Sequence, residues 1–392
     1  MTTSPSDRGE TADMNTATNI RHRFPVFEHR VYLNSCSQGA LANTVRAAYG
    51  SYLDTLEAEG SSWEHWIAQS ERARTAFARL LHARPESVAV TASASAGVAS
   101  LASAFDFGER DTVVTTDLEF PTIGQIWHAQ ARRGARVVHV PAEADNTLSL
   151  ERLAAAIDER TALVAVTHVS YRTGSRLDLA AIAKLAHERG ALLLVDAYQS
   201  AGAVPIDVGA LGVDFVTGGA LKYLLASPGI GYFYANPDTT SHLVPTVTGW
   251  FADVDVNAMQ ISEYRPAPDA RRFEQGTPPI PSVYAAIAGV ELMAEIGVER
   301  TQEHVQGLND RLIDEVVAMG GQVPTPKDRA RRGPLVTVAS TDAERLVERL
   351  GAEGIVTSSR AGNLRVSPHC YNTDDDIDRL LAALRANRDL LR

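Results

Sequence analysis

Short runs of β-branched and apolar residues alternate with stretches of helical periodicity from residue 88 onward. Strands are predicted at SVAVTAS, DTVVTTD, ARVVHVP, TALVAVTHVS, ALLLVDA and VDFVTGG, with helical segments such as AGVASLASAF and DLAAIAKLAHERG between them. Continuous apolar strands joined through helices are typical of a mostly parallel sheet that is covered on both faces. We therefore expect an α/β fold, preceded by helices near 41–59 and 64–83, with GIGYFYA as one more strand.

A segment rich in proline and charge, residues 263–282, interrupts this pattern and is typical of a linker. Helices near 282–297 and 300–318, the helix DAERLVERLGAEG and a final helix from about 373 follow it, with the strands PLVTVAS, IVTSS and NLRVSP between them. The sequence thus predicts a smaller C-terminal α+β domain. The predicted division is a disordered lead-in over 1–19, a large α/β domain over 20–275 and the small domain over 276–392.

Composition narrows the class of partner. The chain has 392 residues, is 45% hydrophobic and carries a formal net charge of −11, which argues against binding to nucleic acid and favours a small-molecule partner. Only Cys36 and Cys370 are present, without metal-ligand spacing, so neither a disulfide framework nor a metal site is expected. No stretch reaches the ~18 apolar residues of a membrane span. A cytoplasmic protein that does not bind membranes is the expectation.

Two ionisable residues follow neighbouring predicted strands. Asp196 comes directly after ALLLV, and Lys222, one of only three lysines, comes after VDFVT among glycines and apolar residues. Ligands of such sheets bind outside the carboxyl ends of the strands, so both side chains should point into one crevice. A lysine amine forms a Schiff base with an aldehyde, and a carboxylate keeps a pyridine nitrogen protonated. The pair favours pyridoxal 5′-phosphate (PLP) as cofactor, although either residue alone is commonly a helix cap or a surface charge.

A small-residue turn could bind the phosphate of this cofactor. In VTASASAGVAS a strand leads into a helix that is predicted to open near Ser95 to Gly97. Backbone N–H groups at a helix start together with hydroxyl groups bind phosphate. The same turn is also an ordinary serine N-cap, so it supports the cofactor only together with Asp196 and Lys222.

Nearly the whole chain, from VYLNSCSQGAL to the last helix, resembles the class V, fold-type I, PLP-dependent enzymes, which include cysteine desulfurases, isopenicillin N epimerase-like proteins and kynureninases. The strongest pieces are VDAYQSAG, VDFVTGGALKYLLASPGIGYFY, RRFEQGTPPIPS and LRVSPHCYNTDDDIDRL. The resemblance implies that Lys222 holds the cofactor, that Asp196 pairs with its ring nitrogen and that Gln199 contacts its phenolic oxygen. Ser95 and Ala96 would hold the phosphate.

The resemblance also assigns residues around the cofactor ring and the substrate. Phe120, in DLEFPT, would stack on the ring, although such a phenylalanine is otherwise an ordinary core residue, and Ser170 falls at or beside a position that contacts the cofactor face. Gly276 and Thr277 match a segment that reaches the phosphate of the partner subunit, which implies a homodimer. Arg365 would bind the α-carboxylate of an amino-acid substrate through paired hydrogen bonds. Without the resemblance, Arg365 would be interpreted as an outward-facing arginine on a strand.

Three positions depart from the family pattern. Desulfurases carry a nucleophilic cysteine shortly before the arginine, but GIVTSSRAGNLRVSP contains none and Cys370 follows Arg365, so persulfide chemistry is not expected. Most relatives have a histidine directly before the lysine and a phosphate-binding serine three residues before it. Leu221 and Gly219 occupy these positions here. Phosphate contacts are therefore expected from another residue, such as Thr217.

These observations predict a PLP-dependent lyase or transferase that acts at Cα or Cβ of an amino acid or amino-acid conjugate. We favour β-elimination, for example carbon–sulfur cleavage of a cysteine conjugate in secondary metabolism such as antibiotic biosynthesis. Transamination, oxidative deamination and epimerisation remain alternatives. A non-enzymatic scaffold predicts loss of Lys222 or Asp196, and both are present. A nicotinamide dehydrogenase would need G-x-G-x-x-G after the first strand, which this sequence lacks.

Overall fold

A computed structural model describes residues 19–392, so the predicted disordered lead-in, except for its last residue, lies outside the described residues. A seven-stranded sheet forms the centre of the larger part, in the order β2-β8-β7-β6-β5-β3-β4. The strands from β3 to β7 pair in parallel, while β8 is antiparallel to both β2 and β7. The strands are β2 (Val88–Thr91), β3 (Thr112–Thr116), β4 (Arg136–Val140), β5 (Thr161–Thr167), β6 (Leu192–Asp196), β7 (Phe215–Gly219) and β8 (Gly231–Ala235). The expected α/β fold is confirmed.

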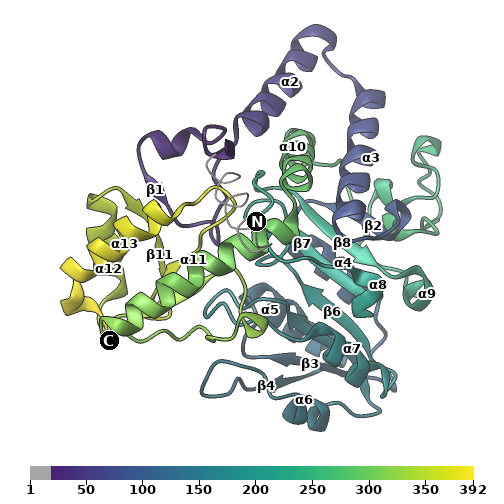
Figure 1. The fold of residues 1–392 in the computed structure, drawn as a ribbon. Coiled ribbons are helices and arrows are strands. Elements are labelled where there is room, and N and C mark those ends of the chain that lie inside the picture. The colour runs from purple at the N-terminus through teal and green to yellow at the C-terminus, as the bar shows by residue number, and fades with distance from the viewer. Residues whose placement is uncertain (1–18) are drawn as a thin grey trace, which may run out of the picture.

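Helices cover both faces of this sheet, which explains why its strands are apolar at successive positions (Figure 1). On β6, Leu193 belongs to the larger hydrophobic core and its neighbour Leu194 to a second core on the other face. The helices of this part are α2 (Asn43–Glu59), α3 (Trp63–Leu80), α4 (Ala94–Ala104), α5 (Pro121–Ala129), α6 (Leu150–Ala156), α7 (Leu179–His187), α8 (Val208–Leu211) and α9 (Pro237–Thr240). Because both faces of the sheet are buried in these two cores, a binding site can form only at the ends of the strands.

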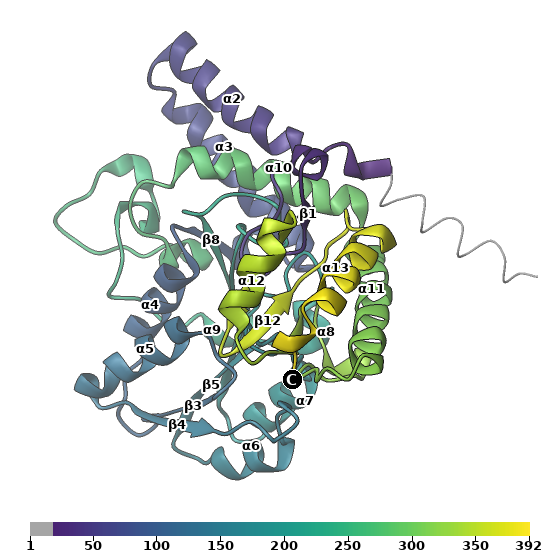
Figure 2. The same ribbon diagram turned by 90° about the vertical axis from the view of Figure 1, so that its left-hand side faces the viewer.

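The C-terminal part is built around a separate hydrophobic core. Its antiparallel sheet has the order β11-β12-β9, and Figure 2 shows α12 and α13 beside it. The elements are α11 (Val298–Ala318), β9 (Val336–Ala339), α12 (Ala343–Ala352), β10 (Ile355–Val356), β11 (Ser358–Arg360), β12 (Asn363–Val366) and α13 (Asp374–Ala386). The strand predicted at IVTSS is divided into β10 and β11.

Two connections tie the parts together. The short strand β1 (Val31–Tyr32), near the beginning of the described chain, pairs in parallel with β10. Helix α10 (Ile280–Ile296) follows the predicted linker, and its buried residues join the core of the large sheet. The predicted boundary at residue 275 stays a prediction, because chain from either side of it packs across the two parts.

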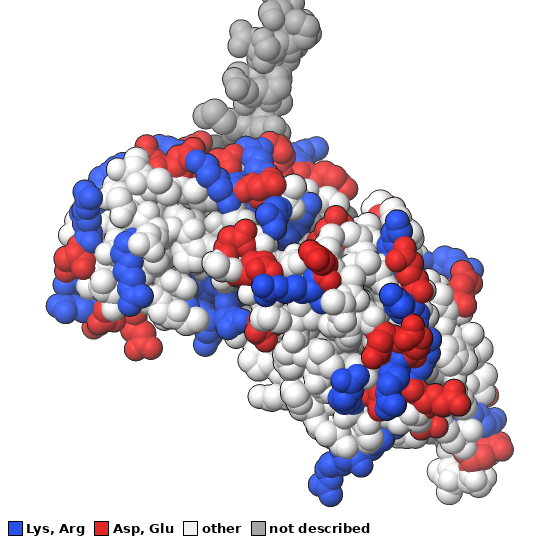
Figure 3. Space-filling view, turned by 90° about the horizontal axis from the view of Figure 1, so that it is seen from below, with Lys and Arg blue, Asp and Glu red and all other residues white. Residues whose placement is uncertain are grey.

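The charges on the surface and the apolar character of the helices are relevant to the predicted absence of nucleic-acid and membrane partners. In the face drawn in Figure 3, acidic and basic side chains are interspersed rather than gathered by sign. Among residues 19–392 no single helix is long and apolar enough to cross a bilayer, and α10 with α11 passes that test only as a pair bent by 75°.

Candidate active site

The site lies at the carboxyl ends of β6 and β7. Asp196 is the last residue of β6 and lies opposite Thr217 of β7 in the parallel register. Its buried carboxylate accepts one hydrogen bond, from the backbone N–H of Tyr198 at 2.9 Å. Burial raises the pKa of Asp196, and the Tyr198 N–H and the Lys222 charge oppose that shift. The carboxylate therefore lacks a close cationic partner within the described chain. A buried carboxylate without such a partner is energetically costly in its charged form.

Lys222 projects from the turn that follows β7, as the sequence predicted. Its Nζ lies 4.5 Å from the ring centroid of Tyr198 and 5.8 Å from that of Phe120, so aromatic rings flank the amine. Burial lowers the pKa of Lys222 to about 8, against the attraction of Asp196. A glycine is needed opposite this turn, because a Cβ on Gly39 would lie 2.2 Å from the Lys222 carbonyl oxygen. The chain at Gly39 thus packs directly against the backbone of the turn that carries the lysine, and the Gly39 N–H donates to the Leu221 carbonyl at 2.9 Å.

Arg365 of β12 is a buried cation in the same region. Its guanidinium donates to the Tyr171 carbonyl at 3.1 Å and to the hydroxyls of Ser37 and Ser358 at 3.1 and 3.0 Å. Its Nε has no partner, and no carboxylate of residues 19–392 lies within ion-pair distance of it. Arg365 is only 3% exposed, and its charge contributes to the lowered pKa of Lys222, for which burial is the largest cause. The site therefore contains a buried positive charge with unused hydrogen-bonding capacity.

The predicted phosphate turn lies at the start of α4, one residue earlier than expected. Ser93 is the N-cap, and its side chain accepts the Ala96 N–H at 3.1 Å. The Ser95 hydroxyl is exposed and lies 3.2 Å from the hydroxyl of Thr122 in α5. The Thr217 hydroxyl, which we expected to replace a missing phosphate contact, donates instead to the Ala94 carbonyl at 3.4 Å. It therefore ties β7 to α4.

The remaining predicted residues surround this crevice in different ways. The Phe120 ring is 42% exposed and meets Tyr171 edge to face. The Ser170 hydroxyl is buried and donates to the Leu118 carbonyl at 3.2 Å. Gln199 donates from Nε2 to the Cys36 carbonyl at 3.0 Å, while its buried Oε1 has no partner. The Phe120 ring therefore lies near the Lys222 amine. The Ser170 hydroxyl, in contrast, donates its hydrogen bond to a carbonyl of the protein itself.

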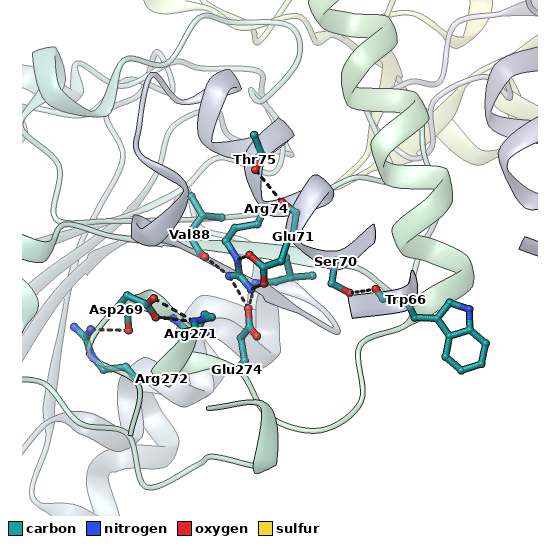
Figure 4. A network of polar contacts seen from close by, with 11 residues as sticks. Trp66, Ser70, Glu71, Arg74, Thr75, Val88, Asp269, Arg271, Arg272 and Glu274 are labelled. Atoms are coloured by element: carbon teal, nitrogen blue, oxygen red, sulfur yellow. Dashed lines mark hydrogen bonds and ion pairs between the residues drawn. The ribbon is translucent and has the colours of Figure 1, made fainter. Parts of the chain in front are cut away.

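Gly276 and Thr277 are exposed, and they follow Glu274, which belongs to the network of polar contacts in Figure 4. Arg74 of α3 donates to Glu274 at 2.8 Å, and both side chains are 4% exposed. Glu274 also accepts the Val90 N–H of β2 at 2.8 Å. A buried ion pair therefore anchors the chain three residues before Thr277.

Sequence reasoning missed several polar residues of the crevice. These are Ser37 and Ser358 at Arg365, Thr122 at Ser95, and Tyr198, which lies beside Lys222. Of these residues only Tyr198 carried a usable signal, because it lies within VDAYQSAG, two residues after Asp196.

The chain was also compared with known proteins. The family profile of class-V aminotransferases matches residues 31–380. An uncharacterized aminotransferase of Bacillus subtilis, YcbU, is 34% identical over 93% of this chain and 96% of its own length. A kynureninase of Pseudomonas fluorescens is 30% identical over 87% of this chain and 84% of its own. The chain belongs to the class-V aminotransferase family.

Solved structures show the same fold. An apo cysteine desulfurase from Thermococcus onnurineus has a TM-score of 0.85 at 21% identity, covering 94% of this chain and 97% of its own. A complex of the cystine C–S lyase C-DES with cysteine persulfide also has a TM-score of 0.85, at 24% identity over 92% and 98% of the chains. The family match and these folds confirm the expected fold-type I architecture, an enzyme of lyase or transferase type, and PLP as the cofactor.

Proposed function

We propose that this protein acts at Cα or Cβ of an amino acid or amino-acid conjugate, with Lys222 as the residue that binds the cofactor covalently. The observation that carries the proposal is the buried Arg365 guanidinium, which has no acidic partner in the described chain and lies near Lys222. A buried unpaired cation is costly, and a substrate carboxylate would supply the missing charge and accept from the free Nε.

The residues present fit the cofactor. Asp196 is a buried carboxylate without a close cation, which suits a protonated ring nitrogen. The Phe120 and Tyr198 rings flank the Lys222 amine and so border the space beside it, while α4 begins nearby with the exposed Ser95 hydroxyl. When bound, PLP supplies a ring that accepts electron density from a substrate carbon. These residues would hold it.

The chain's own residues explain how a substrate would be oriented. Arg365, with the hydroxyls of Ser37 and Ser358, would hold a carboxylate at a fixed distance from Lys222. Since the pKa of Lys222 is about 8, its Nζ can take or return a proton at Cα near neutral pH. The Phe120 ring, in edge-to-face contact with Tyr171, would present an apolar surface to a ligand beside Lys222.

For the reaction type we infer a lyase that eliminates a β-substituent, with carbon–sulfur cleavage of a cysteine conjugate of secondary metabolism, such as antibiotic biosynthesis, as the favoured case. The similarity to kynureninases and the fold shared with a cystine C–S lyase support an enzyme that cleaves side chains. Transamination or oxidative deamination is the second candidate, which the similarity to YcbU favours. We also infer a cytoplasmic homodimer, and the two free buried cysteines suit a reducing compartment.

Arg365→Lys tests the substrate assignment. This change keeps the charge but loses the paired donors, so binding of amino acids should weaken by about 2 kcal/mol, on the order of thirtyfold. Amines without a carboxylate should bind equally to both proteins, and the cofactor spectrum should not change. Titration with amino acids, cysteine S-conjugates and decarboxylated analogues would measure this.

Product analysis by mass spectrometry identifies the reaction in the same samples. Pyruvate with ammonia indicates β-elimination, an amino form of the cofactor indicates transamination, and inverted substrate indicates epimerisation. Equal affinity of both proteins for every carboxylate would refute the proposed role of Arg365.

A further inference from the structure

Tyr198 occupies space that the neighbouring strand leaves open. Tyr198 lies in the turn that follows β6, and its side chain reaches Gly219, the last residue of β7. A Cβ built on Gly219 would lie 2.4 Å from both the hydroxyl oxygen and Cζ of Tyr198. Only glycine can therefore occupy position 219 while the Tyr198 ring lies over it.

The same face of the sheet carries the start of α4. Gly219 lies directly opposite Gly231 in the antiparallel pair of β7 and β8. A Cβ on Gly231 would lie 2.5 Å from the Ser93 carbonyl carbon and 2.6 Å from the Ala94 nitrogen. Directly opposed residues present their Cβ atoms to one face at about 4.5–5.5 Å. The Tyr198 hydroxyl and the start of α4 therefore lie against two directly paired residues, Gly219 and Gly231.

The Tyr198 hydroxyl is available as a donor. Within residues 19–392 it makes no hydrogen bond, although the backbone N–H of the same residue is fixed on Asp196. Burial raises the pKa of Tyr198 to about 12, so the phenol keeps its proton over the working pH range. A neutral donor beside the first turn of an eleven-residue helix suits a bound phosphate.

We propose that the Tyr198 hydroxyl donates a hydrogen bond to the phosphate of the cofactor and so anchors it between Gly219 and the start of α4. This inference rests on the proposed function and gives the phosphate a contact that Thr217 does not supply, because the Thr217 hydroxyl is used on the Ala94 carbonyl. The same side chain borders the Lys222 amine, so one residue would join the phosphate end of the site to the lysine.

The test compares Tyr198→Phe with wild type in the cofactor-free protein. Dissociation constants are measured for PLP and for pyridoxal, which lacks the phosphate. A hydrogen bond to a charged group contributes about 1.5–3 kcal/mol, so PLP should bind at least about tenfold more weakly to Tyr198→Phe. Pyridoxal should bind equally to both proteins. Inorganic phosphate should slow PLP binding to wild type more than to the variant.

Tyr234→Phe is the matched control, because Tyr234 of β8 is a buried tyrosine opposite Val88 and Val216, away from the start of α4. It should bind PLP like wild type. An unchanged PLP affinity of Tyr198→Phe, or an equal loss for PLP and pyridoxal, would overturn the phosphate contact. Failure of wild type to bind PLP or pyridoxal at all would instead refute the proposed function, which keeps the two failures distinguishable.

Discussion

At the scale of single residues, the lowered pKa of Lys222 gives the site a measurable pH dependence. Only the neutral amine attacks an aldehyde, and burial places the pKa of Lys222 at about 8. The rate of covalent PLP capture by cofactor-free protein should therefore rise as the pH increases through about 8 and level off above it. Absorbance after rapid mixing would follow the reaction, and Lys222→Ala should show no covalent phase.

The variant Asp196→Asn tests the pH dependence of PLP capture a second time, because the direction in which its midpoint should shift is known. The Asp196 charge raises the pKa of Lys222, so its removal should move the midpoint to lower pH. A midpoint that moves upward, or a flat wild-type profile between pH 6 and 9, would show that another group controls the capture of the cofactor.

The chemical type of a residue decided which parts of the site the sequence revealed. Lys222 was conspicuous because the chain has three lysines, and Asp196 because it ends an apolar strand. Ser37 and Ser358 were invisible, since serines are common in loops and Ser37 reaches Arg365 across 328 positions of sequence. The position of the Tyr198 hydroxyl depends on the absence of a side chain at Gly219, and this contact between the turn after β6 and the end of β7 becomes visible only in the folded chain.

At the scale of elements, apolar runs and helical periodicity placed the strands and helices of the large sheet, because each buried strand is short, continuous and bounded by turns. The strand pair of β1 and β10 was not predicted. Each strand has two residues, too few to show a period, and their partners lie more than 300 positions apart. The order of strands in the sheet likewise depends on pairing that no local pattern encodes.

The buried pair of Arg74 and Glu274 joins α3 to the segment before Thr277, so breaking it should affect both stability and the site. Glu274→Ala leaves the buried Val90 N–H without an acceptor and leaves Arg74 with Glu71 as its remaining acidic partner, so the free energy of unfolding should fall by about 1–3 kcal/mol. Chemical denaturation would measure this. Glu291→Ala is the control, since its pair with Arg72 is exposed and should contribute below about 1 kcal/mol. Equal effects of the two changes would contradict a structural role for the buried pair.

At the scale of the whole molecule, one exposed region stands out beside Thr277. Large apolar side chains in residues 244–264 are exposed, and Ile261 is 97% exposed. The backbone of Gly249 packs against Gln275, which connects this region to Gly276 and Thr277. Apolar side chains exposed together are typical of an interface. This supports the proposed homodimer, in which Thr277 would serve the site of the partner subunit.

Mixing two inactive variants tests that arrangement. Lys222→Ala removes the covalent attachment, and Thr277→Glu places a negative charge where the phosphate contact is expected. If Thr277 serves the partner's site, a mixed dimer holds one site with both changes and one intact site, and random assortment should restore about a quarter of wild-type activity. If Thr277 serves its own subunit, both sites of every mixed dimer are defective and no activity returns. The variants must be unfolded and refolded together so that subunits exchange, and light scattering would establish that both form dimers of wild-type mass.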